Sequence, residues 1–113
     1  MENYELEKMI QAELADARNS RAAGNEGRAR VCARRAAGLA IGRYFERWMD
    51  QPLPASAYVL LQWLSEREEI QDDLRAAARR LTVRVTPEYK LPHIEDPIDD
   101  AQMLVQGFLE VDL

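Results

Sequence analysis

The segment that most constrains this chain runs over residues 25–49 and consists largely of alanine, arginine and scattered larger apolar residues. It contains no proline, and its small residues recur at helical spacing. With about 100° of turn per residue, its apolar residues fall on three sides of a helix: Val31 and Leu39; Ala33 and Ala40; Ile41, Phe45 and Trp48. A helix that is apolar over most of its circumference is typical of the central member of a bundle. The sequence therefore predicts an all-α core.

Four further helices are expected around the central one. The first carries one apolar stripe, formed by Leu6, Met9, Ile10, Leu14 and Ala17. The fourth is predicted to begin at a capping box of Ser65 and Glu68. It is predicted to end with residues 82–86 as its last turn, because this β-prone segment has no partner strand. The expected helices cover residues 2–22, 25–49, 55–64, 65–86 and 97–109. We expect a five-helix up-and-down bundle in which the other four surround the central helix.

Capping and breaking residues mark the helix boundaries. Gly24 is expected to end the first helix and Asn25 to cap the second. The prolines within residues 52–54 are expected to end the second helix, because proline cannot continue the helical hydrogen-bond pattern. Asp96 followed by Pro97 is typical of an N-cap with proline at the first helical position.

Composition indicates a single domain spanning residues 1–113. The chain is 47% hydrophobic and 31% charged, and no apolar run approaches the ~20 residues of a membrane span. Its acidic N-terminus is unlike a secretory signal, so we expect a cytoplasmic protein without a membrane partner. The single cysteine, Cys32, excludes an internal disulfide and is expected to be a buried, inert thiol. No metal or other cofactor is expected.

Charge is unevenly distributed along the chain, whose net charge is −5. Residues 18–47 carry eight arginines and two glutamates, whereas residues 1–16 and the tail from residue 88 are acidic. Basic and acidic helices lying side by side in one bundle would account for this pattern. The alternative is a basic surface for a phosphate-bearing partner.

Two segments and the last helix carry a family resemblance. Residues 27–38 read Gly-Arg-Ala-Arg-Val-Cys-Ala-Arg-Arg-Ala-Ala-Gly, and residues 76–85 read Ala-Ala-Ala-Arg-Arg-Leu-Thr-Val-Arg-Val. With the final helix behind an acidic cap, the chain resembles small bacterial HEPN-like (higher eukaryotes and prokaryotes nucleotide-binding) helical proteins. The resemblance implies a bundle that dimerises through its helices. It also implies one of several roles: ribonuclease, toxin, nucleotide-linked module or inactive binding partner.

Active members of that family carry an arginine followed four to six residues later by a histidine. The only histidine here, His93, lies nine positions after Arg84, with two prolines between them. Tyr89 stands at the histidine spacing, which makes Arg84 and Tyr89 a formal relic of the motif. An ordinary tyrosine, with a pKa near ~10, is a poor proton shuttle at neutral pH. The sequence therefore predicts a non-catalytic module, in which His93 is a solvent-facing loop residue.

The arginines are the candidate contacts for RNA or a nucleotide. Arg28 and Arg35 project in similar directions from the central helix, whereas Arg30 and Arg34 share a different arc. Arginines of the fourth helix and its end are expected to extend one of these arcs: Arg79, Arg80 and Arg84. The predicted contact set is Arg28, Arg35, Arg79, Arg80 and Arg84. Guanidinium groups suit phosphate geometry.

These observations admit three functional interpretations. The favoured one is a homodimeric HEPN-like interaction module that binds a protein, such as a nucleotidyltransferase, or a nucleic acid. The alternative is a degenerate ribonuclease or nucleotide-binding component of a toxin–antitoxin-type system, using Arg79, Arg80, Arg84 and Tyr89. A third is a ligand pocket between helices, lined by Trp48, Trp63 and Tyr58.

Overall fold

The computed structural model describes residues 3–54, 56–86, 88 and 90–112, with the side chains of 110–112 left out. Within these ranges the chain forms five α-helices and no strand, so the all-α prediction is confirmed. The helices are α1 (Asn3–Ala22), α2 (Glu26–Met49), α3 (Ala57–Ser65), α4 (Asp72–Leu81) and α5 (Pro97–Asp112). None of them is both long and apolar enough to cross a membrane.

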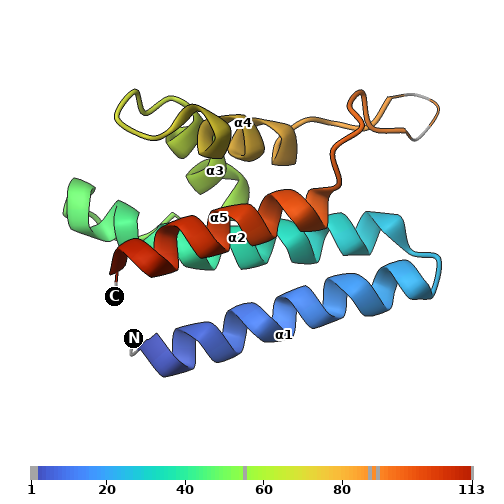
Figure 1. Ribbon diagram of the computed structural model, residues 1–113, viewed down its shortest axis with the longest axis horizontal. Coiled ribbons are helices and arrows are strands. Elements are labelled where there is room, and N and C mark those ends of the chain that lie inside the picture. Colours follow the sequence, from blue (N-terminus) through green and yellow to red (C-terminus); the bar gives the residue numbers. More distant parts are fainter. Residues whose placement is uncertain (1–2, 55, 87, 89, 113) are drawn as a thin grey trace.

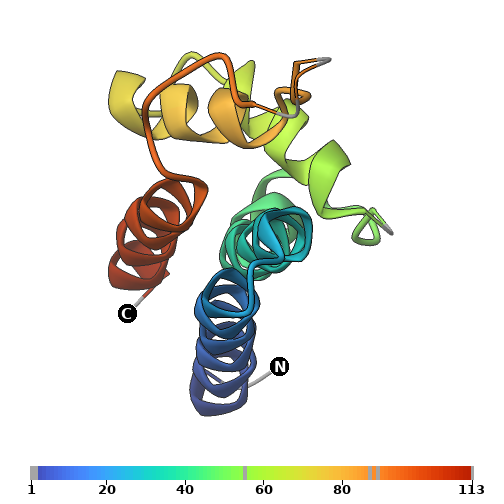
Figure 2. The same ribbon diagram turned by 90° about the vertical axis from the view of Figure 1, so that its right-hand side faces the viewer.

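The central position of α2 determines the arrangement. Figure 1 shows α1 and α2 as an antiparallel hairpin, with α5 running in the same direction as α2. In the end-on view of Figure 2, α3 and α4 form a second layer above these three helices. Helix α2 packs against α1, α3 and α5, whereas α4 packs mainly against α3 and α5. The predicted up-and-down arrangement thus holds for the α1–α2 hairpin. Three helices, rather than the predicted four, pack against α2.

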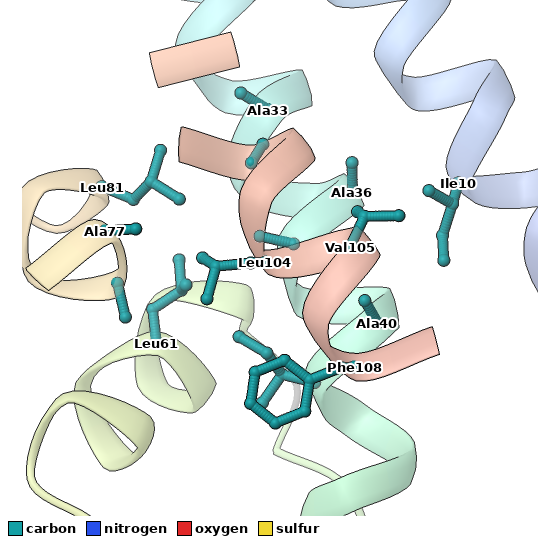
Figure 3. Close-up of a cluster of buried hydrophobic side chains, with 14 of the residues drawn as sticks. Ile10, Ala33, Ala36, Ala40, Leu61, Ala77, Leu81, Leu104, Val105 and Phe108 are labelled. Carbon is teal, nitrogen blue, oxygen red and sulfur yellow. The ribbon is translucent and has the colours of Figure 1, made fainter. Parts of the chain in front are cut away.

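Small residues on α2 allow this close packing. Its alanines at 33, 36, 37 and 40 are fully buried. A Cβ atom on Gly38 would stand 2.7 Å from the Cβ of Ala57, the first residue of α3, so only glycine permits this approach. Larger side chains from the surrounding helices fill the core, as Figure 3 shows for Ile10, Leu61, Leu81, Leu104, Val105 and Phe108.

The predicted caps are largely confirmed. Gly24 has a φ of +82°, which suits glycine at the end of α1. The side chain of Asn25 accepts a hydrogen bond from the backbone N–H of Arg28 at 3.0 Å. Asp96 caps α5 in the same way, because its Oδ1 accepts from the N–H of Ile98 at 2.9 Å.

The predicted start of α4 is wrong. Ser65 is the last residue of α3, and its hydroxyl donates to the carbonyl of Gln62 at 2.7 Å instead of capping a new helix. Helix α4 begins only at Asp72. A serine near a helix end can satisfy a carbonyl of the previous turn as easily as it can cap the next helix.

The predicted end of α4 is also wrong. The helix ends at Leu81, and residues 83–86 follow without helical structure. Three of these four residues are β-branched and have low helix propensity, and a proline follows at position 87, which disfavours helical backbone at residue 86. The segment therefore continues beyond the helix as irregular chain.

Two large apolar side chains on α1 and α2 lie outside the core. Leu6, Ile10 and Leu14 are buried as expected, but Met9 is 44% exposed on the neighbouring edge of the stripe. Trp48 is 57% exposed because it lies near the end of α2. Both residues leave apolar surface in contact with water.

Candidate anion-binding groove

A groove lies where α2, the start of α3 and the chain after α4 meet. Its volume is about 610 Å³, within the usual range for ligand sites. The described residues that line it are Arg30, Arg34, Ser56, Tyr58, Thr82, Val83, Arg84 and Val85. We refer to it as the arginine groove.

Local geometry brings these side chains together. Arg30 and Arg34 are four residues apart on α2 and so project from the same side of the helix. Gly38 lies one turn further along and admits the start of α3, which places Ser56 and Tyr58 beside the two arginines. The early end of α4 at Leu81 leaves the next residues free to line the opposite wall, where Arg84 lies.

The charge of the arginine groove is uncompensated within the described chain. None of its described lining residues is acidic, and Arg30, Arg34 and Arg84 form no ion pair with a described side chain. Burial lowers the pKa of the Arg34 guanidinium, and the positive charge of Arg30 lowers it further. Arginine nevertheless remains charged at neutral pH. The positive charges of Arg30 and Arg34 thus lie close together at a partly buried site.

The start of α3 adds to this positive field. Ser56 caps the helix, with its hydroxyl oxygen accepting from the N–H of Tyr58 at 3.1 Å. A helix N-terminus carries a partial positive charge that favours anions. The hydroxyl of Tyr58 accepts from Gln62 at 3.2 Å, which leaves its own O–H available as a donor.

The predicted arginine set is only partly brought together, because Arg84 alone of its five members lines the groove. Arg80 makes two hydrogen bonds to the buried Asp100, at 3.0 and 2.7 Å, and these raise its pKa. Arg79 donates to the carbonyl of Ser65 at 3.3 Å. Arg35 lies on another side of α2, 4.0 Å from Glu13, and Arg28 is exposed near the start of the same helix.

Two groove arginines, Arg30 and Arg34, are missing from that set. Their shared arc is visible in the sequence as a spacing of four residues. The Arg28–Arg35 arc shows the same regularity, so spacing alone does not distinguish the two. The pair that lies in the groove is the one on the side of α2 that faces the chain after α4.

His93 corrects a prediction, because it does not face solvent. Its side chain is 13% exposed, and Nε2 is buried without a hydrogen-bond partner among the described residues. Nδ1 lies 3.1 Å from the carbonyl oxygen of Glu95. His93 is not among the described lining of the arginine groove. Tyr89, the other half of the motif relic, falls outside the described residues.

The remaining candidates are structural. Cys32 is buried, and burial raises the pKa of its thiol. The described residues contain no group of three or more histidine, cysteine or acidic side chains suited to a metal. The three aromatic residues predicted to line a ligand pocket have different surroundings: Trp63 packs edge-on against Phe45 at 5.0 Å, Trp48 is exposed, and Tyr58 lines the arginine groove.

Comparisons of the chain with models of protein families, with curated proteins and with solved structures yield no match. The resemblance to HEPN-like proteins therefore stays a prediction.

Proposed function

We propose that this protein is a non-catalytic helical interaction module that binds single-stranded nucleic acid in the arginine groove. One observation carries the proposal: Arg30, Arg34 and Arg84 converge on one groove whose described lining contains no carboxylate. Guanidinium groups match phosphate oxygens in geometry and charge. A bound phosphate would relieve the repulsion between Arg30 and Arg34 that the free protein carries.

The other lining residues favour a nucleic acid over a carboxylate-rich peptide. Tyr58 is 36% exposed and offers an aromatic side chain beside the arginines, where a base can stack. Val83 and Val85 add apolar wall to the same groove. The carboxylates of an acidic peptide would pair with the guanidinium groups, but they would not stack on the aromatic ring of Tyr58.

The proposal of a non-catalytic role follows from the chemistry of the groove. Its described side chains are arginine, serine, threonine, tyrosine and valine, and the chain's one histidine lies elsewhere. Backbone cleavage requires a group that moves a proton near neutral pH. The groove as described supplies charge and shape for binding instead.

Fluorescence anisotropy with a labelled, short oligouridylate tests the proposal. Three phosphate contacts on a single strand predict a slope of about −2 for log K against log salt concentration. Replacing Arg30, Arg34 or Arg84 by alanine should weaken binding and reduce the slope magnitude by about 0.7 each. Arg35→Ala is the matched control, because Arg35 follows Arg34 in sequence but lies outside the groove.

Three results would count against the proposal. Equal losses from Arg34→Ala and Arg35→Ala would show that only total charge matters. Competition by polyglutamate as strong as by unlabelled RNA would indicate a general anion site. Cleavage of the oligonucleotide that Arg84→Ala abolishes would support the ribonuclease alternative instead.

A further inference from the structure

The donors of the arginine groove are unevenly distributed within it. Burial lowers the pKa of the Arg34 guanidinium, the charge of Arg30 lowers it further, and Tyr58 raises it. Electrostatic influence falls with distance, so the side chains of Arg30 and Tyr58 lie close to that guanidinium. Arg84 lies in the chain after α4 and is not among the side chains that shift the pKa of Arg34. We call Arg30, Arg34 and Tyr58 the donor cluster.

The donor cluster supplies more charge and more hydrogen-bond donors than an internal phosphate of a strand can use. Each guanidinium carries several N–H donors and a permanent positive charge. The hydroxyl of Tyr58 accepts from Gln62 at 3.2 Å and keeps its own O–H as a donor. An internal phosphodiester carries a single negative charge. A phosphate monoester carries a charge of about −1.5 to −2 at pH 7 and an additional acceptor oxygen, so it matches the two arginines better.

The start of α3 favours the more highly charged phosphate as well. Ser56 caps this helix and lines the groove beside the donor cluster. The partial positive charge of a helix N-terminus attracts a dianion more strongly than a monoanion. No described lining residue is acidic, so no carboxylate of the lining opposes the second negative charge.

The size of the groove limits how much of a strand it can hold. Its volume of about 610 Å³ is that of a site for a small molecule. Surfaces that follow a long single strand cover about 4–16 nucleotides. The groove therefore suits the end of a strand, and Arg84, outside the donor cluster, is available for the next phosphate.

We propose that the donor cluster is a subsite for the terminal phosphate monoester of a nucleic-acid strand, and that Arg84 contacts the phosphodiester next to it. The inference rests on the proposed function, because it assigns parts of a strand to parts of the same groove. It makes the phosphorylated end of a strand the preferred ligand. Phosphates at the 5′ and 3′ ends share this chemistry, and the experiment distinguishes them.

Matched oligouridylates binding to the full chain test the subsite. The strands have one length, carry a 5′-phosphate, a 3′-phosphate or no terminal phosphate, and are labelled at the end without the phosphate. At least one phosphorylated strand should bind about tenfold or more tightly than the unphosphorylated strand, which is the size of one hydrogen bond to a charged group.

The pH dependence of this preference is a second measurement on the unmodified protein. The second ionisation of a phosphate monoester has a pKa near ~6, so the preference should fall to about threefold or less at pH 5. The described groove lining contains no side chain that ordinarily titrates between pH 5 and 7.5. The unphosphorylated strand corrects for any other effect of pH on the protein.

Variants separate the two parts of the groove. Arg34→Ala should reduce the preference for the phosphorylated strand to within about twofold, because it removes half of the charge of the donor cluster. Arg84→Ala should weaken binding of every strand and keep a preference of about fivefold or more. Arg35→Ala is the control and should change neither quantity, because Arg35 lies outside the groove. Circular dichroism establishes that each variant is folded.

The contrary outcomes are distinct. Equal binding of all strands by the unmodified protein would overturn the subsite and leave the proposed binding of nucleic acid intact. Binding of none of them would overturn both. A preference that is unchanged at pH 5, or one that Arg84→Ala abolishes and Arg34→Ala retains, would contradict the assignment of the monoester to the donor cluster. Should Arg34→Ala not fold, the comparison of strands on the unmodified protein still decides.

Discussion

At the scale of single residues, Arg34 has the most informative environment in the chain. Its guanidinium is partly buried, and its charge stands one helical turn from the charge of Arg30. Two other partly buried arginines have acidic partners. Arg80 holds Asp100, and Arg21 holds Asp96 and Glu26. Two neighbouring arginines without a described acidic partner cost stability in the free protein and favour an anion in the bound state.

Replacing Arg34 by methionine tests this cost. The methionine keeps an unbranched apolar stem while removing the repulsion with Arg30, so we expect the free energy of unfolding to rise by about 0.2–0.5 kcal/mol at low salt. Nucleic-acid binding should fall at the same time, as is usual where stability and function compete. Urea denaturation measures the first effect.

Arg35→Met is the control for that measurement. Arg35 lies 4.0 Å from Glu13, so its loss removes a weak attraction and should not stabilise the protein. Destabilisation by Arg34→Met, or equal stabilisation by both variants, would contradict the view that Arg34 is repelled.

At the scale of secondary structure, the contact between α2 and α3 depends on Gly38. A Cβ there would stand 2.7 Å from the Cβ and 3.2 Å from the Cα of Ala57. Gly38→Ala should therefore destabilise the protein by about 1–3 kcal/mol, because α3 must move. Thermal denaturation measures the loss.

Gly27→Ala is the matched variant on the same helix. Gly27 is exposed near the start of α2, and a Cβ added to it would have its nearest neighbouring atom 3.8 Å away. Alanine should be neutral there or stabilise by up to about 1 kcal/mol. If both variants shifted the melting temperature alike, helix propensity rather than close approach would explain Gly38.

The ion pair between α1 and α5 makes stability depend on acid. The hydrogen bonds from Arg21 hold the pKa of Asp96 below its usual range, although burial opposes them. A carboxylate with a lowered folded pKa contributes stability above its unfolded pKa of ~3.9, and this contribution is lost as pH falls through the folded value. The protein should therefore lose stability below about pH 4.

Asp96→Asn isolates this contribution. Asparagine still caps α5, so the variant should lose about 1 kcal/mol or less at neutral pH, since the pair is one-third exposed. Its stability should then decline less steeply than that of the original protein between about pH 5 and 3. Parallel declines in urea titrations would exclude Asp96 as a source of the acid sensitivity.

The helices show what sequence patterns predict well. Asn25 and Asp96 are followed at once by helical, amphipathic sequence, and both cap as predicted. Ser65 satisfies the same rule, yet it ends α3 because its hydroxyl bonds backward to Gln62. The local sequence permits both outcomes, and the packing of α3 and α4 against each other decides between them.

At the scale of the whole molecule, the all-α fold can be predicted from the apolar circumference of α2. The position of the arginine groove cannot. Helical periodicity identifies Arg30 with Arg34 and Arg28 with Arg35 as sharing arcs. It does not say which neighbour covers each arc. Arg84 is fifty positions beyond Arg34 and reaches it only because α3 and α4 return the chain across α2. Contacts between residues this far apart in the chain cannot be predicted from local sequence patterns.

The central claim of the proposal is that two arginines of α2 and one from the chain after α4 bind one nucleic-acid strand. Its most direct test is an NMR titration that follows the arginine Nε–H groups as oligouridylate is added. We predict progressive shifts for Arg30, Arg34 and Arg84 and for the backbone amides of residues 82–85, while Arg79 and Arg80 stay unchanged. Shifts centred on Arg28 and Arg35, or no shifts at millimolar oligonucleotide, would contradict the claim.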